Sequence, residues 1–146
     1  MKILIAYDGS TPAQHMLGQL IERLGWFRDP PQLTLLYVHP ALPHGRAVAW
    51  AGKEAVENYY REESETCLAS GRTLLDARDV RHEVQREVGD PSTEILNTAQ
   101  RGGFDLIAMG RHGAGGLVTM VLGSVASKVL ARSDIPVLLL GHASQA

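Results

Sequence analysis

The ten residues Ile3-Leu4-Ile5-Ala6-Tyr7-Asp8-Gly9-Ser10-Thr11-Pro12 hold the pattern that decides the fold. The apolar run that ends at Tyr7 is typical of a strand buried on both faces, as in parallel sheets. Ser10 or Thr11 can accept hydrogen bonds from free amides at a helix start, and Pro12 suits the first turn because no N–H is needed there. Apolar residues then recur at the 3.6-residue helical period up to Leu24. The chain therefore opens with a strand that leads directly into a helix.

The rest of the chain repeats this alternation. Further strands are expected over residues 33–39, 80–88, 104–109 and 135–140, and further helices over residues 52–78, 90–101 and 122–130. Apolar and polar residues alternate over residues 80–88, so this strand has one exposed face and is expected at an edge of the sheet. Pro136 lies near the start of the last strand, where an edge strand tolerates proline.

This order of elements predicts the fold class, an α/β protein with a single open five-stranded parallel sheet and helices on both faces, Rossmann-like in topology. No repeat, linker or break in composition divides the chain, so residues 1–146 are expected to form one domain. The long helix over residues 52–78 has one plausible inward face, made of Val56, Tyr60, Cys67, Gly71 and Leu74 or Leu75.

The composition excludes several classes of function. A net charge of −2 over 146 residues provides no basic field for nucleic acid, and no cluster of lysine and arginine suggests a membrane surface. The single cysteine, Cys67, can form no internal disulfide, and Asp8 interrupts the first apolar run too early for a signal peptide. We therefore expect a cytoplasmic protein. The six histidines show no metal-binding spacing, so no metal-ligand set is expected.

In parallel sheets of this kind, ligands bind at the carboxyl ends of the strands, where the strand order reverses. The segment that leaves the fourth strand, from Gly110 to Val125, is rich in glycine. Gly110 and Gly113 let the backbone turn tightly and approach a bound group without a Cβ in the way. Gly123 and Ser124 lie where the last helix begins, so free amides and the positive end of the helix dipole face the same region. Together these features predict a cradle for an anion such as a polyphosphate.

The spacing Gly110-x2-Gly113-x9-Gly123-Ser124 resembles the signature of the ATP-binding branch of the universal stress proteins, with every fixed position filled. Other parts agree, namely Ile-Leu-Ile-Ala-Tyr-Asp-Gly-Ser at the start, Leu-Tyr-Val-His in the second strand, Gly89-Asp90-Pro91, and Ile-Pro-Val-Leu near the end. The resemblance covers essentially the whole chain and implies the adenine-nucleotide alpha-hydrolase-like variety of the fold.

The resemblance also implies a set of cofactor-binding residues. Asp8 and the backbone of Val38 would face adenine and ribose, and Met109 would line the pocket. Gly110, Gly113, Gly123, Ser124 and Val125 would hold ribose and phosphates through backbone amides and the serine hydroxyl. Ala6 and Tyr7 are further candidates for the wall. Asp8 has an alternative interpretation as a helix cap, and Arg111 and His112 are left out because nearby glycines let them point either way. A bound triphosphate usually brings Mg²⁺.

Other nucleotide and enzyme classes fit less well. A P-loop needs lysine after its last glycine, and here Gly116 follows Gly115. A dinucleotide fingerprint would follow the first strand, a serine hydrolase would contain G-x-S-x-G, and a receiver domain would carry paired acids after the first strand. None of these patterns is present.

Three functions remain open. The favoured one is an ATP-binding regulatory or stress-response module with at most slow hydrolysis, because no residue is evidently placed as a base for water and no catalytic residue is assigned. The others are an adenylate-transfer enzyme on the same fold, and a dimeric protein-interaction domain without nucleotide. The last strand, Ile135–Leu140, is apolar and expected at an edge, and the resemblance implies a homodimer formed by pairing this strand between subunits.

Overall fold

The computed structural model describes residues 1–43, 49–113 and 122–141 of the chain. Its centre is a five-stranded parallel sheet with the strand order β3-β2-β1-β4-β5. The strands are β1 (Lys2–Ala6), β2 (Gln32–His39), β3 (His82–Val88), β4 (Leu106–Gly110) and β5 (Val137–Leu140). The expected fold class is confirmed, and β3 and β5 are the two edges, as their sequences indicated.

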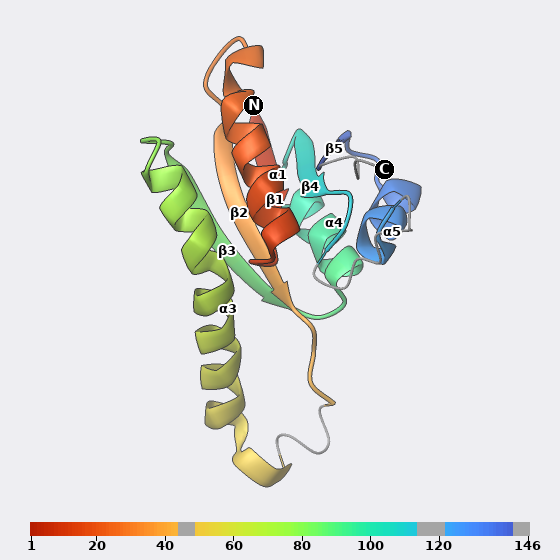
Figure 1. Ribbon diagram of the computed structural model, residues 1–146. Coiled ribbons are helices and arrows are strands. Elements are labelled where there is room, and N and C mark those ends of the chain that lie inside the picture. Colours follow the sequence, from red (N-terminus) through yellow and green to blue (C-terminus); the bar gives the residue numbers. More distant parts are fainter. Residues whose placement is uncertain (44–48, 114–121, 142–146) are drawn as a thin grey trace, which may run out of the picture.

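Helices cover both faces of the sheet. They are α1 (Thr11–Glu22), α3 (Lys53–Asp76), α4 (Pro91–Arg101) and α5 (Ser124–Arg132), with a short 3₁₀ helix, η1 (Leu24–Trp26), after α1. Helices α1 and α3 lie on one face, and α4 and α5 lie on the other (Figure 1). Strand β5 begins two residues later than expected, because Pro136 has no N–H to pair; its carbonyl accepts a hydrogen bond from the Ile107 amide at 3.0 Å.

The first strand is apolar on both faces because it supplies both halves of the core. Ile3 and Ile5 point into the cluster under α1 and α3, whereas Leu4 points into the cluster under α4 and α5. All three side chains are fully buried. Edge strand β3 differs, since none of its residues is fully buried and Val88 at its end is exposed.

Helix α3 packs closely on the sheet through a glycine. The buried residues of α3 are Ser64, Leu68, Gly71 and Leu75, so the inward face lies somewhat to one side of the predicted one, and Cys67 is only half buried. A Cβ built on Gly71 would lie 2.8 Å from Leu35 Cδ2 and 3.0 Å from Tyr7 Cε1. The absence of a side chain at Gly71 therefore sets how closely α3 can approach β1 and β2.

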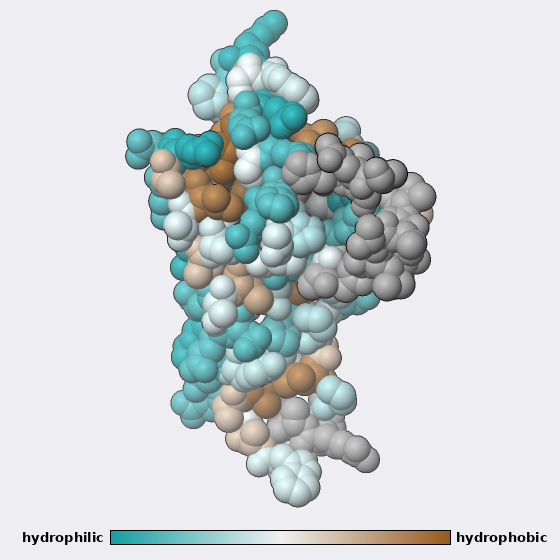
Figure 2. Space-filling view, viewed as in Figure 1, coloured by the Kyte–Doolittle hydropathy of each residue, from teal (hydrophilic) through white to brown (hydrophobic). Residues whose placement is uncertain are grey.

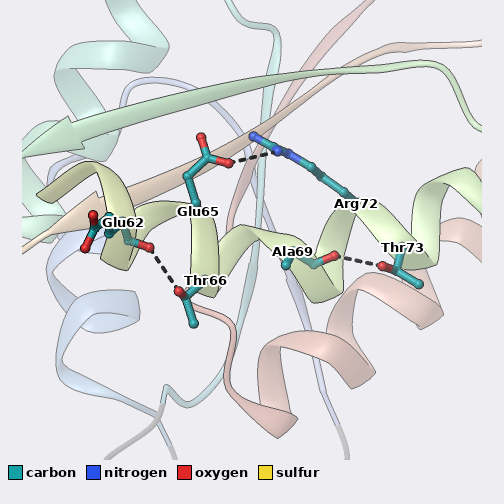
Figure 3. Close-up of polar contacts among 6 residues, drawn as sticks. All are labelled: Glu62, Glu65, Thr66, Ala69, Arg72 and Thr73. Carbon is teal, nitrogen blue, oxygen red and sulfur yellow. Dashed lines mark hydrogen bonds and ion pairs between the residues drawn. The ribbon is translucent and has the colours of Figure 1, made fainter. Parts of the chain in front are cut away.

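The outer face of α3 is polar, and several of its side chains bond within the helix. Arg72 forms an ion pair with Glu65 at 3.3 Å, as Figure 3 shows. The Thr66 hydroxyl donates to the Glu62 carbonyl at 2.9 Å, and the Thr73 hydroxyl donates to the Ala69 carbonyl at 3.0 Å.

Hydrophilic residues cover most of the described surface in the view of Figure 2, with apolar residues gathered in smaller patches. Within the described ranges, no helix has the length and apolar character needed to cross a membrane.

We expect Gly71→Ala to be less stable than Gly18→Ala by about 1–3 kcal/mol, because the new methyl group overpacks the contact with Leu35 and Tyr7. Gly18 lies in α1, and a Cβ there would meet nothing within 4 Å. Both changes replace a helical glycine by alanine, so the gain in helix propensity cancels and the difference reports packing. Urea unfolding of the two variants measures it, and equal midpoints would contradict the close approach of α3.

Candidate functional site

A cavity of about 470 Å³ opens at the carboxyl ends of β1, β2 and β4. The chain runs from β1 outward to β2 on one side and places β4 on the other, so the cavity lies at the point where the strand order reverses. Its volume falls within the range of about 300–1,000 Å³ that is common for small-molecule sites. Its position therefore marks it as the candidate site, and its size suits a small molecule.

All eight residues predicted from the sequence line this one cavity, namely Asp8, Val38, Met109, Gly110, Gly113, Gly123, Ser124 and Val125. Ala6 and Tyr7, the further wall candidates, line it as well. So do Arg111 and His112, which the sequence prediction left out. The cavity brings these residues together; their roles as ligand contacts stay a prediction.

Sequence reasoning missed much of the apolar wall. Pro40, Pro91, Ile95 and Ala126 also line the cavity. Pro91 and Ile95 lie four residues apart on α4 and therefore share one helix face. That spacing was visible in the sequence. Assigning the face to the cavity, however, required knowing how α4 packs against β2, β3 and α5.

Asp8 supports the start of α1 and borders the cavity at once. Its Oδ1 atom accepts hydrogen bonds from the Ser10 amide at 3.0 Å and from the Ser10 hydroxyl at 2.5 Å. Ser10 is the N-cap of α1, and its hydroxyl accepts from the Ala13 amide at 3.3 Å. The other carboxylate oxygen, Oδ2, would lie 3.1 Å from a Cβ on Gly113. The interpretation of Asp8 as the helix cap is therefore wrong, because Ser10 is the N-cap; Asp8 holds the capping serine in place and lines the cavity.

The glycines of the predicted motif allow backbone segments to approach closely. The Gly123 amide donates to the Arg111 carbonyl at 2.7 Å, and a Cβ on Gly123 would lie 3.1 Å from that same oxygen. The Arg111 amide in turn donates to the Leu140 carbonyl at 3.1 Å, which ties the loop to β5. A Cβ on Gly110 would lie 3.1 Å from the His112 carbonyl. Residues 114–121, between the second and third glycines of the motif, lie outside the described part of the chain.

Helix α5 starts differently from the other helices at this end of the sheet. Side chains cap α1 and α4, through Ser10 and Asp90. Helix α5 begins after Gly123, and among the described residues no side chain caps it. The first amides of a helix have no partner within it and carry the positive end of the helix dipole. Ser124 and Val125, which hold such amides, line the cavity, so this wall can bind an anion.

The cavity contains few charged side chains. Asp8 is the carboxylate, and Arg111 and His112 are the basic residues, among the described residues that line it. Burial raises the pKa of Tyr7 above its usual value, against the lowering effect of the hydrogen bond from Ser70, and burial also raises the pKa of Tyr37. Both phenols therefore stay neutral at physiological pH. In the described part of the chain, no group of three or more His, Cys, Asp or Glu residues is placed to hold a metal ion.

An open parallel sheet with a cavity at its switch point, lined by a glycine turn and by a helix start that no described side chain caps, defines a Rossmann-like α/β protein. The model of the universal stress protein family matches residues 1–141, and the chain belongs to that family. It is 28% identical over 139 residues to the universal stress protein MJ0531 of Methanocaldococcus jannaschii, covering 95% of this chain and 81% of the relative. It is 31% identical to the universal stress protein Sll1388 of Synechocystis sp., covering 97% of each chain.

Solved structures show the same fold. The hypothetical protein MJ0577 has a TM-score of 0.75 at 28% identity, covering 99% of this chain and 97% of its own. A universal stress protein family protein from Arabidopsis thaliana, solved with AMP bound, has a TM-score of 0.66 at 17% identity, covering 96% and 90%. A universal stress protein solved in complex with cAMP has a TM-score of 0.59 at 20% identity, covering 99% and 98%.

The cap of α4 predicts a pH dependence of stability. Hydrogen bonds from the Ser92 hydroxyl and from the Thr93 amide hold the pKa of Asp90 down from 3.8 to about 2. Because the folded pKa lies below the unfolded one, the stabilisation is present above pH 4 and is lost as the pH falls towards 2.

At pH 5 we therefore expect the parent to unfold at a higher urea concentration than Asp90→Asn, and the two midpoints should converge as the pH approaches 2. Urea unfolding at several pH values measures this. Ser92→Ala should move the convergence to higher pH, since it removes the largest cause of the low pKa. A gap that stays constant with pH would contradict the assignment.

Proposed function

We propose that this protein is an ATP-binding universal stress protein, a regulatory module whose interactions change when the nucleotide is bound. One observation carries the proposal. A single cavity joins an apolar wall on one side to a glycine turn and an uncapped helix start on the other. An adenine nucleotide has the same two-part chemistry, a flat apolar base and a charged phosphate chain.

The residues divide into two groups along this cavity. Val38, Ile95, Met109 and Ala126 are all buried members of the core beneath α4 and α5, and they would pack around the base. Asp8, with Val38 through its backbone, would face adenine and ribose. Gly110, Gly113, Gly123, Ser124 and Val125 would surround the phosphates. Family members of the same fold, solved with AMP and with cAMP, support an adenine nucleotide as the ligand class.

Magnesium would enter with the triphosphate and be held mainly by it. Mg²⁺ is commonly bound by one or two carboxylates together with phosphate oxygens and water. Asp8 is the carboxylate that the described cavity wall offers, and it would face adenine and ribose, so phosphate oxygens and water would supply the ligands of the ion. When bound, the ion would neutralise phosphate charge.

Hydrolysis would be slow at most. A general base has to reach the attacking water, and Oδ1 of Asp8 already accepts two hydrogen bonds from Ser10. This favours a binding module over an adenylate-transfer enzyme.

The cytoplasm remains the expected compartment, and the domain is proposed to span residues 1–146.

Calorimetric titration with ATP and Mg²⁺ tests the proposal. The parent should bind, and Ser124→Asp should bind at least about tenfold more weakly, because the added carboxylate repels the phosphates. An acidic residue in the first turn favours the helix dipole, so this variant should keep the fold. Ser127→Asp adds the same charge to α5 at an exposed position outside the cavity lining and is the matched control. It also removes the hydrogen bond from the Ser127 hydroxyl to the Gly123 carbonyl at 2.9 Å, so binding that persists in this variant assigns the loss in Ser124→Asp to the charge within the cavity.

The outcomes separate the remaining functions. Binding by the parent and by Ser127→Asp, with loss in Ser124→Asp, supports the nucleotide module. Absence of heat and of thermal stabilisation with ATP, ADP, AMP and cAMP would reject it and favour the interaction domain without nucleotide. Rapid release of pyrophosphate or ADP would favour an enzyme.

A homodimer through β5 is part of this proposal. Strand β5 is an edge of the sheet, and Val137, Leu138 and Leu139 are only half buried in the single chain. Unpaired apolar edges are normally covered, and a second copy of the strand would do so. Gel filtration with light scattering should therefore give the mass of two subunits at micromolar concentration. The mass of one subunit would contradict the dimer and leave the nucleotide proposal intact.

A further inference from the structure

His112 carries a nitrogen atom that the fold leaves without a partner. Its Nδ1 atom is buried, and within the described residues it makes no hydrogen bond. Buried polar atoms in native proteins are nearly always paired, so an unpaired one requires an explanation. The explanation we consider is a ligand atom, because His112 also lines the cavity.

The backbone of His112 is held on two sides. A Cβ on Gly110 would lie 3.1 Å from the His112 carbonyl oxygen, and one on Gly123 would lie 3.3 Å from the His112 Cα. The backbone of His112 is therefore closely approached on two sides, and the ring is the part that can turn towards a ligand. Rotation about the Cβ–Cγ bond exchanges Nδ1 with Cδ2, and this torsion is broad in histidine. The imidazole can thus turn its Nδ1 atom towards a bound group without a change of backbone.

The surroundings select the chemistry of that group. His112 lies between Gly110 and Gly113, beside the uncapped start of α5, where the wall favours an anion. The side chain of Arg111, the other basic residue of the wall, packs against Gly141. A Cβ built on Gly141 would lie 3.8 Å from the Cβ, Cγ and Cδ atoms of Arg111. Arg111 also lies between Gly110 and Gly113, but its side chain packs against Gly141, so among the described residues His112 is the basic side chain beside the start of α5.

We propose that His112 is a ligand-binding residue and that its Nδ1–H donates a hydrogen bond to a phosphate oxygen of the bound nucleotide. The inference rests on the proposed function. It makes His112 a specificity determinant, because the bond adds to the affinity for phosphorylated adenylates and adds nothing for adenosine. The site then distinguishes a nucleotide from its nucleoside through a side chain as well as through backbone amides.

Three substitutions test which nitrogen is used. The amide nitrogen of asparagine lies near the position of Nδ1, whereas that of glutamine lies near the position of Nε2. Titration with ATP should show affinity lowered about tenfold or more in His112→Ala and His112→Gln, as expected for a lost bond to a charged group, and largely kept in His112→Asn. Adenosine should bind equally to all four proteins. His82→Ala is the matched control, since His82 lies on β3 outside this cavity.

A direct readout is the ¹⁵N chemical shift of His112 Nδ1, which should move when ATP is added and stay unchanged with adenosine. If the parent binds ATP and the three variants bind it equally well, the role of His112 is wrong and the proposed function stands. If the variants lose ATP and adenosine alike, His112 is structural and the inference is overturned. If the parent binds no adenylate, the proposed function itself fails, and this inference with it.

Discussion

One backbone hydrogen bond, from the Gly123 amide to the Arg111 carbonyl at 2.7 Å, holds the site together. It joins the loop that leaves β4 to the residue that begins α5. The Arg111 amide extends the connection to Leu140 at the end of β5. Glycine at position 123 favours this bond, since a Cβ would approach the same carbonyl to 3.1 Å and displace it. The two hydrogen bonds of Arg111 therefore fix the cavity wall, the start of α5 and the end of β5 relative to one another.

Much of this arrangement could be predicted from the sequence. The apolar run before Asp8, the helical period after it and the repeated alternation predict a parallel sheet whose carboxyl edge holds the cavity. The glycine spacing then located one wall of the cavity, because glycine lets the backbone turn tightly and approach other groups closely. Local pattern was sufficient wherever one element or one turn determined the geometry.

What could not be predicted depends on contacts between elements. The inward face of α3 includes Leu68 and leaves Cys67 half buried, because the contact of Gly71 with Leu35 and Tyr7 sets the rotation of the helix. The apolar wall from α4 escaped notice for the same reason. The orientation of His112 was also undecidable, since the glycines beside it allow either direction until the backbone contacts are known.

The cavity is continuous with the core, and this bears on the choice between a binding module and a ligand-free interaction domain. Val38, Ile95, Met109 and Ala126 belong to the buried cluster under α4 and α5, yet they also line a space of about 470 Å³. Among the described residues no side chain caps the start of α5 beside this space, so its first amides can meet a ligand. One ligand with an apolar part and an anionic part would contact both features, which favours the binding module over an interaction domain without nucleotide.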